Sequence, residues 1–146
     1  AADRAAGRGS GGRAVSKHEI IRVRDVMKQN VDTVDGMDTV EAALRKMDHV
    51  ETKTLVVNKR DENDAYGIVM FSDIARKVLA RDRPPSRVNI YEIMTKPVIS
   101  VEPDMDIRYC ARLFDRLHLS RAPVISKGEI LGVVSFSDMV VKGIKK

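Results

Sequence analysis

One tripeptide occurs twice in the chain, each time where an apolar run gives way to a new element. Phe71-Ser72-Asp73 follows Gly67-Ile-Val-Met70, and Phe136-Ser137-Asp138 follows Gly132-Val-Val-Ser135. A carboxylate at the first turn of a helix can accept hydrogen bonds from two ribose hydroxyls, while the backbone N–H groups of that turn attract phosphate. Ser and Asp are also ordinary helix-capping residues. Each tripeptide therefore indicates either a nucleotide-binding carboxylate or a plain helix cap.

The two copies differ three residues before the aspartate. Ser135 has a hydroxyl that can reach a ribose or phosphate oxygen. Its counterpart Met70 has a thioether, which donates no hydrogen bond. We therefore expect one nucleotide-sized ligand per chain, bound mainly beside Ser135 and Asp138.

A repeat with a spacing of 67 residues supplies the elements that must hold these side chains. The matched apolar positions of the two opening segments are Ile21, Val23, Val26 and Met27 against Val88, Ile90, Ile93 and Met94. The match continues from residues 31–34 to residues 98–101. These short β-branched segments predict a strand in each copy.

A helix is predicted after each of these strands. Asp38 with Glu41 forms a capping-box pattern, and Asp106 is the expected cap in the second copy. The apolar positions at helical spacing are Val40, Ala43, Leu44 and Met47 in the first copy, and Ile107, Cys110, Ala111 and Phe114 in the second. Cys110 is therefore predicted to be a buried, unreactive small hydrophobe.

A hairpin and a second helix complete each copy. The hairpin strands are predicted at 55–57 with 66–71, and at 123–125 with 130–136. The final helices have apolar positions Ile74, Val78 and Leu79, and Met139, Val140 and Ile144. The sequence thus predicts an α/β fold of two β-α-β-β-α units, residues 18–82 and 83–146, which pack together because each leaves apolar surface uncovered. Residues 1–17 are expected to be a flexible tail or a cloning remnant.

Over about residues 20–145 these units resemble a tandem pair of cystathionine-β-synthase (CBS) domains, a Bateman module. The segments that carry the resemblance are Ile93-Met94-Thr95 with residues 98–101, Arg121-Ala122-Pro123-Val124, and Gly132 to Asp138. The resemblance implies two motifs packed as a pseudo-two-fold pair and a homodimer of such pairs. It also implies clefts that bind a regulatory adenosyl ligand: AMP, ADP or ATP, with S-adenosylmethionine or NAD possible.

The resemblance also implies a set of ligand-binding residues. They are Ser100, Arg121, Ala122, Pro123, Val124, Ser135, Ser137 and Asp138 in the second motif, and Thr33, Lys53, Ser72 and Asp73 in the first. Arg121, with Lys53 as its approximate counterpart, is placed to pair with phosphate or is a solvated surface charge. Ser100 and Thr33 meet the adenine or are solvent-facing strand hydroxyls. The Ala-Pro pair forms an apolar wall or is ordinary strand-edge structure.

Composition and charge argue against other classes of protein. No P-loop, nucleophile elbow or Rossmann glycine run is present, and the three histidines lack metal-ligand spacing, so neither an enzyme nor a metal site is expected. Residues 1–17 carry a net charge of +3 and residues 18–146 only +2, which disfavours a nucleic-acid-binding face. One cysteine and no long apolar run predict a soluble, cytoplasmic protein without a membrane partner. The alternative to a non-catalytic adenosyl sensor is a ligand-free dimerisation or protein-interaction module.

Overall fold

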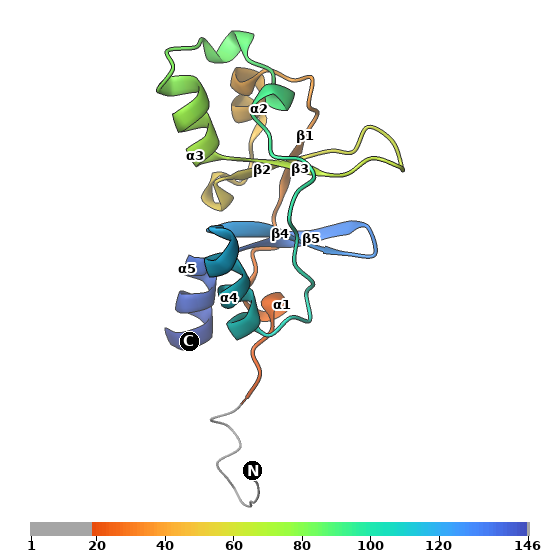
Figure 1. The fold of residues 1–146 in the computed structure, drawn as a ribbon, viewed down its shortest axis with the longest axis vertical. Helices are drawn as coiled ribbons and strands as arrows, with labels where there is room; N and C mark the ends of the chain where they lie inside the picture. Colours follow the sequence, from red (N-terminus) through yellow and green to blue (C-terminus); the bar gives the residue numbers. More distant parts are fainter. Residues whose placement is uncertain (1–18, 146) are drawn as a thin grey trace, which may run out of the picture.

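The computed structural model describes residues 19–145, and the predicted tail lies outside the described residues. A three-stranded sheet has the order β1-β2-β3, with bounds Asp32–Val34, Thr54–Val57 and Gly67–Met70. A two-stranded sheet pairs β4 (Arg121–Ser126) with β5 (Glu129–Ser135). β1 and β2 are parallel, and both hairpins are antiparallel. In Figure 1 the two sheets lie one above the other and their hairpins project to the same side, so the predicted α/β pair of motifs is confirmed.

Helices α3, α4 and α5 lie on the side opposite the hairpin tips (Figure 1). The helix bounds are α1 Val23–Val26, α2 Val40–Lys46, α3 Phe71–Ile74, α4 Ile107–Leu117 and α5 Phe136–Val140. α3 continues as a π-helical turn, η3, over Ala75–Leu79, and α5 continues as η6 over Val141–Lys145. Short 3₁₀ turns occur at η2 Val50–Thr52, η4 Pro85–Arg87 and η5 Ile90–Glu92.

Two local predictions were wrong. The cap of α2 is Thr39, whose hydroxyl accepts a hydrogen bond from the Ala42 amide at 3.1 Å, and not Asp38. The predicted strand at 98–101 forms a single bridge, from Val101 to Val124, among the described residues. The Val98 amide donates to the carbonyl of Tyr66 in the first motif instead, so this segment is held between the motifs rather than in a ladder.

The opening segments, residues 21–28 and 88–95, are exchanged between the two cores. Val23 and Val26 are buried against the second motif's core, whereas Ile90 and Ile93 are buried against that of the first. The first opening segment is joined to β5 by a reciprocal pair of backbone hydrogen bonds of 2.9 Å between residues 28 and 133. Gly132 permits this approach, because a Cβ there would lie 2.3 Å from the carbonyl oxygen of Lys28. Each core is therefore completed by residues from the other half of the repeat.

The helices bury their predicted apolar positions unequally. Cys110 and Phe114 of α4 are fully buried, which confirms the predicted stripe of that helix. On the final helices, in contrast, Leu79, Val140 and Ile144 are 68%, 54% and 77% exposed. The final helices thus present apolar side chains that this chain itself does not cover.

Candidate functional site

Asp138 is buried in the first turn of α5, where its side chain is used within the chain. Its Oδ2 accepts hydrogen bonds from the amide and the hydroxyl of Ser135, at 3.0 and 2.9 Å. The Ser135 hydroxyl in turn accepts from the Asp138 amide at 3.1 Å, which completes a capping box. The second carboxylate oxygen, Oδ1, lies 2.5 Å from Nζ of Lys28. Asp138 is therefore the N3 carboxylate of a capping box whose N-cap is Ser135, and its second oxygen is held by a cation.

Arg121 brings a second cation to the same end of the hairpin. It begins β4 and is the register partner of Ser135 on β5. Its guanidinium crosses to the first motif and donates to the carbonyl of Thr52 at 2.9 Å. A guanidinium has five N–H groups, and this bond uses one of them, so Arg121 has further donors for an anion.

The remaining predicted residues of the second motif lie around this hairpin. Ala122 and Val124 are buried in the core, and Pro123 lies between them on β4. Ser100 is exposed and directly precedes Val101, whose amide donates to the carbonyl of Pro123 at 3.1 Å. Ser137 is exposed beside Asp138. Ser100 thus lies beside β4, whereas Ser137 and Asp138 follow the end of β5.

The first motif places its counterparts similarly, but without the hydroxyl. Asp73 is buried, and its Oδ2 accepts from the Met70 amide at 2.8 Å. Its Oδ1 is bound at 3.0 Å by Arg76, a residue of the same helix. Ser72 is exposed on the first turn of α3. Lys53, which directly precedes β2, is also exposed. The two carboxylates thus differ in the source of their cation: Arg76 is local, whereas Lys28 comes from the exchanged opening segment.

Thr33 is not brought to the Asp138 site. It lies exposed in the middle of β1, opposite Val56, and lines a small pocket of about 30 Å³ with Asp32 and Lys46. Sequence reasoning also missed Lys28. Its counterpart at a spacing of 67 is Thr95. This replacement of a neutral hydroxyl by a cation is the difference between the repeats that could have identified Lys28.

Cys110 takes no part in this site. Its side chain is fully buried, and burial raises the pKa of the thiol to about 11. The described residues also contain no group of three or more His, Cys, Asp or Glu side chains placed to hold a metal ion. No helix in residues 19–145 has the length and apolar character needed to cross a membrane.

Comparison with solved structures finds close matches to this architecture. A hexameric CBS-CP12 protein from bloom-forming cyanobacteria has 40% sequence identity and a TM-score of 0.81, over 84% of this chain and 68% of that chain. The CBS domain pair of protein MJ0100, in complex with 5′-methylthioadenosine and S-adenosyl-L-methionine, has 26% identity and a TM-score of 0.72. That match covers 88% of this chain and 100% of the MJ0100 pair.

Sequence comparison agrees with the structural matches. An uncharacterized protein from Methanopyrus kandleri is 30% identical over 82% of this chain, which spans about three fifths (61%) of that relative's length. The CBS domain family matches this chain twice, at residues 23–80 and 90–143. Because these two matches cover both repeats and well over half of the sequence, the chain belongs to the CBS domain family and carries a tandem pair of its domains.

Proposed function

We propose that this CBS pair is a non-catalytic regulatory module that binds an adenosine-containing ligand, AMP, ADP or ATP, in the cleft beside Ser135 and Asp138. The observation that carries the proposal is a buried carboxylate with a hydroxyl on one side and Lys28, from the first opening segment, on the other. Arg121 lies at the same end of the hairpin, as the register partner of Ser135. The MJ0100 pair is solved with two adenosyl compounds, which supports an adenosyl ligand for this chain. S-adenosylmethionine and NAD are further candidates.

The binding mode follows from the partners of Asp138. Ribose hydroxyls donate to Oδ1 in place of Lys28, and the released ammonium group pairs with phosphate together with Arg121. Ser100 then contacts the adenine, while Ala122, Pro123 and Val124 are buried and act only through the backbone of β4. Because Lys28 belongs to an exchanged opening segment, its release alters a contact between the two halves. Ligand binding thereby favours one arrangement of the motifs over another.

We place the principal ligand in the second motif. The first motif, with Thr33, Lys53, Ser72 and Asp73, has Met70 where the second motif has Ser135. The local pair with Arg76 also competes for the Asp73 carboxylate. Both differences weaken ribose binding at the first motif.

Calorimetric titration with AMP, ATP and S-adenosylmethionine tests the proposal. We expect one site per chain and a rise in melting temperature with the ligand that binds. Two equivalent sites per chain would overturn the asymmetry. If none of these compounds nor NAD binds, the adenosyl proposal is wrong.

We further propose that the chain forms a homodimer through its final helices. Leu79, Val140 and Ile144 are exposed there, and α3 and α5 lie on the same side of the molecule (Figure 1). The hexameric cyanobacterial relative supports assembly through CBS pairs. Light scattering should give a dimer for the parent and a monomer for Ile144→Asp. Met37→Asp, a charge placed at another exposed apolar residue, should stay dimeric.

The second candidate function is a ligand-free dimerisation or protein-interaction module. It is favoured by one observation, namely that both oxygens of Asp138 already have partners within the chain. Under this alternative the parent dimerises but shows no thermal shift with any adenosyl compound.

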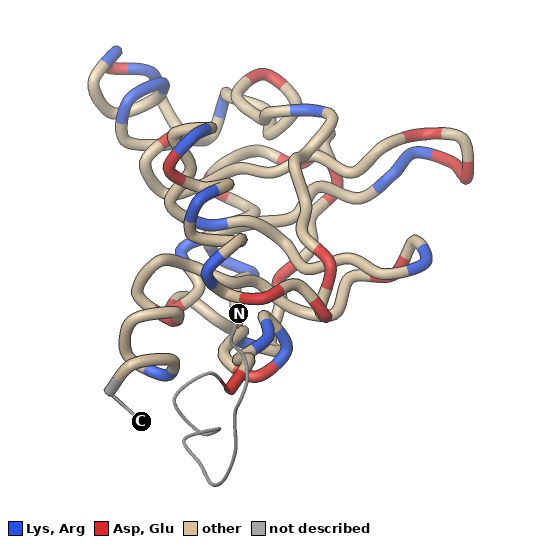
Figure 2. Tube along the Cα trace, turned by 60° about the horizontal axis from the view of Figure 1, so that its bottom comes forward, with Lys and Arg blue, Asp and Glu red and all other residues tan. Residues whose placement is uncertain are grey.

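The distribution of charged residues does not favour nucleic acid as a partner. Figure 2 shows Lys and Arg interspersed with Asp and Glu along the described chain rather than gathered on one face. A cytoplasmic location without a membrane partner stays a prediction from composition. A steep salt dependence of DNA or RNA binding would contradict the first expectation.

A further inference from the structure

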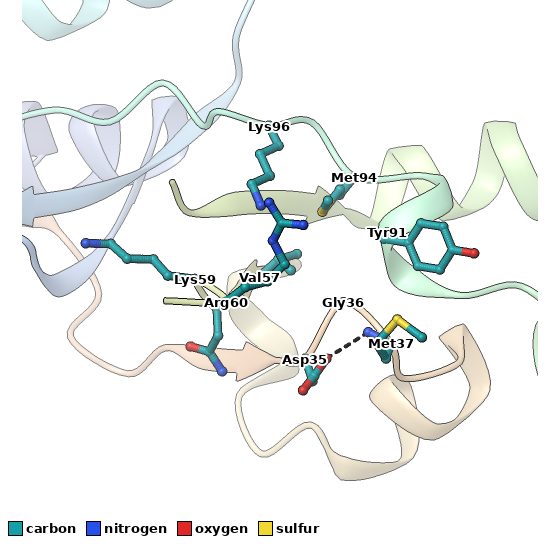
Figure 3. A pocket seen from close by; sticks show the side chains of 10 residues that line it. Asp35, Gly36, Met37, Val57, Lys59, Arg60, Tyr91, Met94 and Lys96 are labelled. Atoms are coloured by element: carbon teal, nitrogen blue, oxygen red, sulfur yellow. Dashed lines mark hydrogen bonds between the residues drawn. The ribbon is translucent and has the colours of Figure 1, made fainter. Parts of the chain in front are cut away.

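A pocket lies on the first motif, at the opposite ends of its strands from Lys53 and Asp73. Lys53 and Asp73 lie where β2 starts and β3 ends. The pocket opens beyond Val34 and Val57, where the parallel strands β1 and β2 finish. It is an open cavity of about 730 Å³ (Figure 3). Its location separates it from the proposed adenosyl site.

One wall of this pocket is cationic. Lys59, Arg60 and Lys96 line it, the first two from the β2–β3 connection and the third from the segment after the second opening (Figure 3). Arg60 and Lys96 share one carboxylate, that of Asp64, at 3.0 and 2.7 Å. Lys59 lies over the ring of Tyr66, with its Nζ 5.0 Å from the centroid. Three cationic side chains therefore line this wall, with Asp64 shared between two of them. The pocket also has one acidic lining residue, Asp35, whose carboxylate accepts from the Met37 amide at 2.8 Å, while Asp61 and Glu62 are exposed farther along the connection.

The shared carboxylate fixes that wall. Asp64 is only 9% exposed, and hydrogen bonds from Arg60 and Lys96 hold the pKa of its carboxyl well below the ordinary value. Asp64 therefore stays ionised and keeps both cations at the pocket across the neutral range. The connection that carries it is further tied to the second hairpin by the Tyr66 hydroxyl, which donates to the carbonyl of Gly128 at 3.2 Å.

The opposite wall is aromatic and apolar. Tyr91 and Met37 lie across the pocket from Lys59 in Figure 3, and they are 50% and 72% exposed. Met94 and Val57 line the space between the walls. A cationic wall facing an aromatic one suits a ligand that combines an anionic group with a planar apolar body.

The repeat shows that this arrangement is particular to the first motif. At a spacing of 67, Tyr91 corresponds to Arg24 and Met37 corresponds to Asp104. Arg24 and Asp104 form an ion pair with each other across the second motif. The second hairpin also has the short turn Lys127–Gly128 in place of residues 58–66, which supply Lys59 and Arg60. The first motif alone therefore combines an open aromatic wall with a cationic one.

We propose that this pocket binds a small aromatic anion, with its phosphate or carboxylate on Lys59, Arg60 and Lys96 and its ring against Tyr91 and Met37. Such a molecule would be a second effector, distinct from a ligand at Asp138. The proposal stands on the pocket alone and does not depend on adenosyl binding.

Phenyl phosphate and benzoate are the probes, titrated into ¹⁵N-labelled full-length chain and followed by amide chemical shifts. We expect saturable shifts at Gly36, Arg60 and Tyr91 with at least one of the two. Whichever binds more tightly identifies the anionic group. Inorganic phosphate and benzyl alcohol, which each carry only half of the chemistry, should bind at least about tenfold more weakly.

Four variants test the assignment. Lys59→Glu and Tyr91→Ala should each weaken binding of the better probe by about tenfold or more. The matched controls Arg116→Ala and Tyr109→Ala, both at exposed positions of α4, should bind as the parent does. The proposal is overturned if neither probe saturates, if the shifts gather around Asp138, or if the pocket variants and the controls behave alike.

Discussion

Nζ of Lys28 lies 2.5 Å from Oδ1 of Asp138, although the two residues are 110 positions apart in the chain. Lys28 ends the first opening segment, and Asp138 lies in the first turn of α5. Asp138 is 5% exposed at its side chain and Lys28 30%, so the pair is partly shielded from solvent. A ligand that takes this carboxylate oxygen therefore acts directly on a contact between the first residues of the fold and its last helix.

Replacing Asp138 with alanine separates its role as a cap from its role as a ligand acceptor. Loss of two hydrogen bonds to a charged group, at ~1.5–3 kcal/mol each, should weaken AMP or ATP binding about 100-fold or more. Asp106→Ala is the matched control, because it removes the cap of α4 and about 1 kcal/mol of stability while leaving affinity unchanged. Calorimetry and urea denaturation measure the two effects. If Asp138→Ala is less stable yet binds AMP as the parent does, Asp138 is only a cap.

Replacing Lys28 with methionine should destabilise the fold by ~1–3 kcal/mol, because a buried carboxylate loses its cationic partner. Arg24→Met removes an exposed ion pair with Asp104 and should cost less than about 1 kcal/mol. Urea denaturation of both variants gives the comparison. Equal losses would mean that the Lys28 pair contributes no more than a surface ion pair.

Cys110 should resist thiol reagents while the protein is folded. Burial raises the pKa of its thiol from 9.0 to about 11, and the thiolate is the reactive form. The folded state thus holds this proton more tightly than the unfolded chain does. The corresponding stabilisation is complete below about pH 9 and is lost as the pH rises towards about 11. Labelling at pH 8 should be slow without urea and fast with it. Rapid stoichiometric labelling of the native protein would contradict this expectation.

His118 has a backbone conformation that glycine adopts at a lower energetic cost. It ends α4 with φ at 58°, in the left-handed region where a Cβ is unfavourable. His118→Gly should stabilise the fold by about 1 kcal/mol. Arg116→Gly, in the last turn of the same helix, should destabilise it, by up to the ~1 kcal/mol that glycine costs in a helix interior. Thermal or urea denaturation decides the signs, and a loss of stability in both variants would refute the prediction.

Local patterns located the helices and hairpins because each depends on neighbours in the sequence. The stripe of Cys110 and Phe114 and the cap at Asp106 are such features, and the structure confirms both. The exchange of opening segments has no local signal. Val23 and Ile90 occupy equivalent repeat positions, and their spacing does not say which core will bury them.

The candidate site divides in the same way. Ser135 and Asp138 are three residues apart, so the sequence places them together, but it predicts a ligand contact for the Ser135 hydroxyl and not the capping box that the structure shows. Lys28 reaches that carboxylate only through the fold. The pocket on the first motif likewise combines Arg60 with Tyr91, from segments that no motif links. The exposure of Ile144 was missed because helical periodicity marks apolar positions without showing what covers them.

The exchanged opening segments also have a consequence for how such a chain arises by duplication. A single copy of the repeat carries an opening segment that does not pack on its own core. The core is complete only when a second copy is present, because the opening segment of each copy packs on the core of the other. Two separate copies would already have the two-fold arrangement, and a link through residues 81–87 makes the exchange intramolecular without altering its contacts. Once fused, the two copies need not stay identical, and Tyr91 and Arg24 are one pair of equivalent positions that differ.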